Sequence, residues 1–112
     1  MSMMIPVKRN FQVYSGGTWE VLFELKKKVG EALNLTAYTV KFVIEEPNAP
    51  NLELTEGAGL TVTKLTGLVL VVLTAAQSAL VTPNQTRNWW ISLEAAGAVS
   101  FPCSGILEYE VP

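Results

Sequence analysis

The stretch GLVLVVLTAAQSALVTPNQTRNWWISLE, residues 67–94, carries the most informative pattern in the chain. It opens with a run of branched aliphatic residues of strand length and closes on an alternating segment typical of a half-buried strand. Between the two, the Thr74 side chain is placed to cap the backbone amide of Gln77, whose own side chain reaches back, as in a capping box. Pro83 prevents the helix from continuing. The stretch therefore predicts one short helical turn, near residues 75–81, between two β-strands.

Alternation of apolar and polar residues, the pattern of half-buried strands, recurs along the rest of the chain. Turn clusters separate the alternating segments at intervals of roughly 8–15 residues, which is typical of sandwiches and barrels rather than of βα units. A lone short helix between two late strands fits the crossover at one end of an immunoglobulin-like sandwich. The clearest alternating segments are TWEVLFEL (residues 18–25), YTVKFVIEE (38–46), LTVTK (60–64) and WWISLE (89–94).

We therefore expect an all-β chain, an immunoglobulin-like antiparallel β-sandwich of about 7–8 strands with one short helical turn. Residues 1–14 are expected to form an N-terminal arm and the first strand, and residues 15–112 the sandwich, in a single domain. The last strand, from Val99 to Val111, is interrupted by Pro102 and Gly105. Because proline cannot donate a hydrogen bond to a neighbouring strand, this interruption predicts an edge strand with a β-bulge.

The composition excludes several classes of function. The 112-residue chain has a net charge of −2, so it lacks the basic surface that nucleic acids require, and we interpret Lys26–Lys28 as a solvated loop. No apolar run approaches the roughly 20 residues of a membrane span. The N-terminal residues MSMMIPVKRN lack the apolar core of a signal peptide, and the single cysteine permits no internal disulfide. These features predict synthesis in a reducing cytosol, with no nucleic-acid or membrane partner.

Residues that commonly catalyse reactions or bind metals are scarce. The chain contains no histidine, which removes the commonest general base and metal ligand and leaves Cys103 without an activating partner. All ten acidic residues are glutamates, whereas calcium loops rely on short Asp and Asn ligands. The pairs Glu45–Glu46 and Glu108–Glu110 lie in a loop and on an outward strand face, where solvation explains them. We therefore expect no enzyme activity, no catalytic residues, no metal and no cofactor.

The order of the segments resembles the immunoglobulin-like domain of bacteriophage tail and baseplate proteins, of the type found at the N-terminus of baseplate upper proteins. The resemblance covers residues 15–112, and its marks are LTAYTVKF (35–42), LTAAQSALV (73–81) and SGILEYEV (104–111). In that family the domain is an antiparallel β-sandwich that attaches virion components to one another and has no catalytic residues. The resemblance implies a non-enzymatic virion structural protein, made in the host cytoplasm, that serves as an assembly or adaptor module of the tail, baseplate or fibre-attachment region.

The sequence is also compatible with different functions. Family members often continue into a stem and a receptor-binding part, whereas this chain stops at Pro112, which favours an adaptor over a host-receptor-binding role. A capsid decoration or cement protein is an alternative within virion proteins. A carbohydrate- or ligand-binding β-sandwich, with Trp90 as a stacking platform, is an alternative of another class. A sugar site calls for amide or carboxylate groups around the aromatic ring, and the expected neighbours of Trp90, Val43 and Ile106, are apolar.

Several strands place apolar residues on the face that is predicted to meet solvent. In an immunoglobulin-like topology these residues form two patches on opposite faces, one on each sheet. Contiguous exposed apolar groups mark interfaces, and tryptophan is enriched among interface hot spots. The predicted protein-interface residues are Leu22, Leu68, Leu70 and Val72 in one patch, and Val43, Trp90 and Ile106 in the other.

We expect the two patches to bind other virion proteins and further copies of this chain, in a homo-oligomer or a larger assembly. Two different patches on opposite faces suit a head-to-tail contact, which builds rings or filaments. Alternatively, the N-terminal segment folds over one patch, or β-bulges re-aim some of these side chains.

Overall fold

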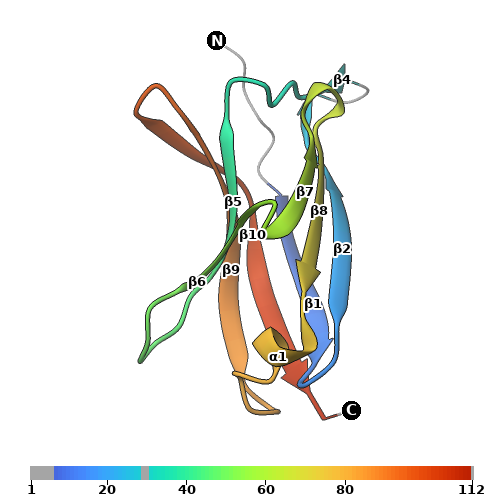
Figure 1. Cartoon of the computed structure of the whole chain (residues 1–112), viewed down its shortest axis with the longest axis vertical. Helices are drawn as coiled ribbons and strands as arrows, with labels where there is room; N and C mark the ends of the chain where they lie inside the picture. Colours follow the sequence, from blue (N-terminus) through green and yellow to red (C-terminus); the bar gives the residue numbers. More distant parts are fainter. Residues whose placement is uncertain (1–6, 29–30, 112) are drawn as a thin grey trace.

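The computed structural model describes residues 7–28 and 31–111 and is an all-β structure (Figure 1). Its strands are β1 (Val7–Tyr14), β2 (Trp19–Glu24), β3 (Lys26–Lys28), β4 (Glu31–Ala32), β5 (Thr39–Ile44), β6 (Leu52–Glu56), β7 (Gly59–Thr63), β8 (Leu68–Leu73), β9 (Thr86–Ala95) and β10 (Ala98–Glu110). A 3-10 turn, η1 (Lys64–Thr66), precedes β8, and the short helix α1 (Ala75–Ser78) follows it. The expected fold class is confirmed. Residues 1–6, most of the expected N-terminal arm, lie outside the described residues.

Eight strands form one sheet in the order β1-β10-β9-β5-β6-β7-β8-β2. The sheet folds over on itself at β6 and β7, so that β1, β10, β9 and β5 face β7, β8 and β2 across a single core (Figure 1). Most neighbours are antiparallel, as expected, but β1 pairs with β10 and β6 with β7 in parallel. The short strands β3 and β4 pair with each other, so the loop expected at Lys26–Lys28 is instead a strand.

The position of β10 differs from the expectation. This strand lies between β1 and β9, so the prediction of an edge strand is wrong. The predicted bulge is present, because the register between β10 and β9 shifts between Ser100 and Cys103. Pro102 lies within this irregularity, before Cys103, where the described pairing with β1 begins. Its missing N–H is therefore tolerated by the bulge and does not require an open edge along the whole strand.

Trp89 lies at the centre of the core, on the inward face of β9. It is 1% exposed, and its ring centroid lies 5.3 Å from those of Phe23 and Phe42 and 5.7 Å from that of Phe11. These three rings come from β2, β5 and β1, so Trp89 joins both halves of the folded sheet. Aromatic pairs at such distances contribute about 0.5–1.5 kcal/mol each beyond the area that they bury. The inward position of Trp89 agrees with the alternation of residues 89–94, in which its neighbour Trp90 takes the outward face.

Gly105 gives the Trp89 indole access to the backbone of β1. The Nε1–H group of Trp89 donates a 3.1 Å hydrogen bond to the carbonyl oxygen of Arg9, which satisfies the one polar atom of the buried ring. In the sheet, Gly105 lies between these two residues, opposite Trp89 on one side and Arg9 on the other. A Cβ atom on Gly105 would collide with the Arg9 carbonyl oxygen and would lie 2.9 Å from Trp89 Nε1. Only glycine fits this crossing point.

The helix α1 closes one end of the sandwich (Figure 1). The Thr74 hydroxyl accepts a hydrogen bond from the Gln77 amide, and the Gln77 side chain accepts one from the Thr74 amide, so the predicted capping box is confirmed. Ser78 is fully buried, and its hydroxyl donates to the Gly17 carbonyl at 2.6 Å and accepts from the Gly16 amide at 3.0 Å. These bonds fasten the helix to the turn between β1 and β2.

Candidate functional site

The outer face of β8 and β2 carries the first group of predicted interface residues. The two strands pair antiparallel, and Leu22 on β2 lies directly opposite Leu70 on β8. Leu68 and Val72 are the next outward residues on β8, to either side of Leu70. All three β8 residues are partly exposed, and Leu22 is 58% exposed. The structure therefore brings these four residues into one contiguous apolar surface, which we call the β8 patch.

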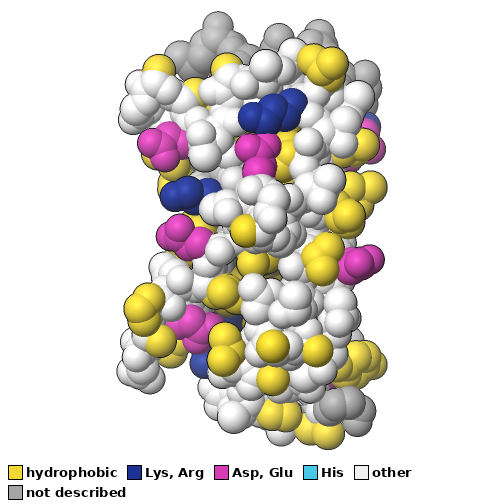
Figure 2. Space-filling model, viewed as in Figure 1, with side chains coloured by type: hydrophobic (Ala, Val, Ile, Leu, Met, Phe, Trp, Pro, Cys, Tyr) yellow, Lys and Arg dark blue, Asp and Glu magenta, His cyan; other side chains and the backbone are white. Residues whose placement is uncertain are grey.

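Polar side chains border the β8 patch on two sides. On β2, Glu20 and Glu24 flank Leu22 and lie opposite the ends of the patch. On β7, Thr61 and Thr63 face the patch from the other side. In Figure 2, hydrophobic side chains gather along the side of the molecule formed by β8 and β2, with a carboxylate beside them. Glu24 forms an ion pair with Lys26 at 3.1 Å, so the border carries charges of both signs. An apolar centre with a polar rim is the usual anatomy of a protein–protein interface.

The second group of predicted interface residues does not form a comparable surface. Trp90 on β9 lies between Val43 on β5 and Ser104 on β10, whereas Ile106 lies opposite Asn88. The expected placement of Trp90 directly between Val43 and Ile106 is therefore wrong by two positions on β10. Val43 alternates along β5 with core residues and is not part of the core cluster. Its side chain is nevertheless buried, at 5% exposure. Trp90 is partly exposed, and Ile106 is 38% exposed.

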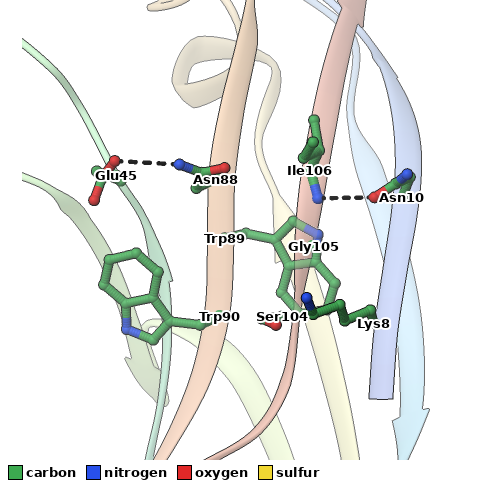
Figure 3. A pocket seen from close by; sticks show the side chains of 9 residues that line it. All are labelled: Lys8, Asn10, Glu45, Asn88, Trp89, Trp90, Ser104, Gly105 and Ile106. Carbon is green, nitrogen blue, oxygen red and sulfur yellow. Dashed lines mark hydrogen bonds between the residues drawn. The ribbon is translucent and has the colours of Figure 1, made fainter. Parts of the chain in front are cut away.

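Trp90 borders a shallow pocket of about 440 Å³ with a mixed lining (Figure 3). The pocket is lined by Lys8 and Asn10 from β1, Glu45 just after β5, Asn88, Trp89 and Trp90 from β9, and Ser104, Gly105 and Ile106 from β10. The expectation that Trp90 has only apolar neighbours is therefore wrong, since amide, carboxylate and ammonium groups lie around it.

The sequence contained a signal for only part of this pocket. Asn88 lies two residues before Trp90 and so shares its face of β9, which alternation alone predicts. Lys8 and Asn10 reach the pocket only because β1 pairs in parallel with β10, opposite Ser104 and Ile106. No local pattern indicates that pairing.

Both members of the pair Glu45–Glu46 have partners within the protein. The Oε2 atom of Glu46 lies 2.9 Å from Nε of Arg87, and both side chains are largely shielded from solvent, at 17% and 16% exposure. The Oε1 atom of Glu45 accepts a hydrogen bond from Asn88. Within residues 7–28 and 31–111, no three His, Cys, Asp or Glu side chains are grouped so that they would hold a metal ion. No helix among them has the length and apolar character needed to cross a membrane.

Cys103 is a buried free thiol on β10. Burial raises the pKa of the Cys103 thiol from 9.0 to about 11, and the positive charge of Arg9 lowers that pKa only in part. Because the thiolate is the nucleophilic form of cysteine, a thiol that stays protonated at neutral pH reacts poorly. The structure thus agrees with the interpretation of Cys103 as a small buried hydrophobic residue.

The raised pKa of Cys103 predicts a loss of stability in alkaline solution. The thiol ionises more readily in the unfolded chain, so its contribution to the free energy of unfolding is complete below about pH 9 and falls as the pH rises toward 11. Urea denaturation of the native protein and of Cys103→Ala, from about pH 8 to pH 10.5, measures this difference. We expect the free energy of unfolding to fall more steeply with pH in the native protein. Parallel curves would contradict the assignment.

No family model matches the chain, and no curated protein sequence is similar to it. Among solved structures, the chain is similar to the N-terminal domain of phage TP901-1 ORF48. The two superpose with a TM-score of 0.55 at 11% sequence identity, over 94% of this chain and 84% of that one. This likeness shows a shared fold with a domain of a phage protein.

Proposed function

We propose that this protein is a non-enzymatic structural protein of a bacteriophage virion, an assembly or adaptor module of the tail, baseplate or fibre-attachment region. The observation that carries the proposal is the fold, which the chain shares over 94% of its length with a domain of a phage protein. The state of two titratable side chains supports the non-enzymatic part of the proposal. The Cys103 thiol is buried with a raised pKa, and the Glu46 carboxylate is held in an ion pair.

The β8 patch is the proposed contact with other virion proteins or with a second copy of this chain. Its four apolar side chains are contiguous, and Leu22 is the most exposed of them. Full burial of an aliphatic side chain contributes about 1.5–3 kcal/mol, and the partly exposed β8 residues contribute less because some of their area is already buried. The charged residues at the border, Glu20 and the ion pair of Glu24 with Lys26, help to orient the partner.

Substitution of the central residue tests this contact. Leu70→Lys is expected to weaken binding at least about 10-fold, because the complex would bury an ammonium group at the centre of an apolar interface. In the free protein, the same group stays at the surface with Glu20 and Glu24 on the neighbouring strand, so folding is retained. The measurement is affinity for purified products of the adjacent structural genes, together with the mass of the isolated protein by light scattering.

Val99→Lys is the matched control, because Val99 is 50% exposed and lies on β10, in the half of the folded sheet opposite the β8 patch. We expect this variant to bind like the native protein. Equal binding by Leu70→Lys and Val99→Lys would overturn the assignment of the contact. Binding to capsid shell proteins alone would contradict the tail assignment and support the decoration-protein alternative.

A further inference from the structure

The pocket beside Trp90 lies on the outer face of β1, β10, β9 and β5 and combines an aromatic wall with polar groups (Figure 3). Trp90 points outward because Trp89, its neighbour, occupies the core, and successive side chains of a strand take opposite faces. The face of an aromatic ring carries partial negative charge. It therefore attracts the weakly positive C–H groups that line the apolar face of a pyranose ring.

Two amide side chains of the pocket each make one hydrogen bond within the protein. Asn88 donates from Nδ2 to Oε1 of Glu45 at 3.3 Å, and Oδ1 of Asn10 accepts from the backbone amide of Ile106 at 3.2 Å. Within the described residues, these bonds occupy one end of each amide. The carbonyl oxygen of Asn88 and the NH₂ group of Asn10 thus offer an acceptor and a donor to a ligand, and the second carboxylate oxygen of Glu45 offers a further acceptor.

The charges and size of the pocket narrow the class of ligand. Its lining holds one cation, Lys8, and one anion, Glu45, so a strongly charged ligand would meet repulsion as well as attraction. A purely apolar partner would bury the amides and the carboxylate without hydrogen bonds, which is costly. The volume of about 440 Å³ lies within the range of roughly 300–1,000 Å³ for small-molecule sites. A neutral ligand with many hydroxyl groups and one apolar face satisfies all these conditions.

We infer that this pocket binds a neutral oligosaccharide that lies across β5, β9, β10 and β1, with Trp90 as the stacking surface at one end and Asn88 and Glu45 as hydrogen-bonding groups near it (Figure 3). Asn10 supplies a hydrogen-bonding group at the other end. Ile106 adds an apolar contact at the edge of the pocket. The pocket and the β8 patch lie on opposite halves of the folded sheet. Saccharide binding and the proposed protein contact are therefore independent, and each is tested by its own variants.

The indole N–H NMR signals of the three tryptophans in the isotope-labelled full chain report binding directly. The probes are maltotriose, mannotriose, galactotriose and the trimer of N-acetylglucosamine, each added to about 20 mM to detect a Kd of about 1 mM. We expect at least one probe to shift the Trp90 signal along a saturable curve while the signal of Trp19, which does not line the pocket, stays in place. Asn88→Ala should weaken that binding about 2- to 12-fold, the effect of one lost hydrogen bond.

Two variants test whether a saccharide binds in this pocket or at another aromatic residue on the surface. Trp90→Ala should abolish binding, followed through backbone amide signals, whereas Phe101→Ala should leave it unchanged. Phe101 is also an exposed aromatic residue, at 56%, but it lies beside the β-bulge of β10 and does not line the pocket. The inference is overturned if no probe gives a saturable shift, or if Trp90→Ala binds as well as the native protein. It is also overturned if the Trp90 signal responds only to a protein of the assembly, which would make this pocket part of a protein contact.

Discussion

Replacing Trp89 by alanine is expected to lower the free energy of unfolding by about 3–5 kcal/mol, the range for deleting a large buried aromatic side chain. Trp89 contacts rings from both halves of the folded sheet, and its indole N–H satisfies the carbonyl of Arg9. The variant loses these contacts and leaves a cavity between the two halves. Urea denaturation followed by far-UV circular dichroism measures the change. The free energy of unfolding of a typical domain is about 5–15 kcal/mol, so this loss would remove a large part of it.

The adjacent residue supplies the control for that experiment. Trp90→Ala removes the same side chain from the opposite face of the same strand, where it is only partly buried. We expect this variant to lose no more than about 1 kcal/mol, as is typical of substitutions outside the core. Equal losses for the two variants would show that Trp89 does not hold the two halves of the sheet together.

Gly105→Ala is expected to lower the free energy of unfolding by about 3 kcal/mol, the upper part of the usual range for overpacked sites. The added Cβ would meet the backbone carbonyl of Arg9, which has no rotamer to move into, and the indole of Trp89. To make room, β1 must shift away from β10, which breaks the hydrogen bond between Trp89 and Arg9. Urea denaturation measures the loss, and amide hydrogen exchange should show faster exchange in β1 than in the native protein.

Gly97→Ala distinguishes this collision from the general cost of replacing a glycine. Gly97 has a positive φ of 81°, and a Cβ there would meet nothing within 4 Å. Its replacement should lower the free energy of unfolding by only about 1–2 kcal/mol, the cost of placing a residue with a Cβ atom in the left-handed region. Amide hydrogen exchange in β1 should stay unchanged. If both variants speed exchange in β1 alike, the close approach at Gly105 is not the cause.

Local features of the fold were predictable because their causes are local. The capping box at Thr74 and Gln77 involves residues three positions apart, so the short segment itself specifies it. The alternation in β5 and β9 likewise indicated which residues enter the core. The edge position predicted for β10 was wrong because Pro102 constrains only its own position, and the bulge absorbs that constraint.

The candidate site was predictable only in part. The contiguity of Leu22 with the outward residues of β8 follows from the immunoglobulin-like topology, and the structure places them together. The surroundings of Trp90 were not predictable, because they depend on the register of β9 with β10 and on the position of β1. A register that differs by two residues keeps every side chain on its face and changes all its neighbours.

The amino-acid pattern of β9 is enough to direct Trp89 into the core and Trp90 out of it, because alternation is a property of the extended backbone. What the outward indole meets depends instead on the assembled domain. Asn10 lies beside Ile106 although the two are 96 positions apart in the chain, through a parallel pairing that the packing of the whole domain selects. The face of a residue is thus set within its strand, whereas its neighbours are set by contacts between distant strands. These contacts place polar groups around the partly exposed Trp90.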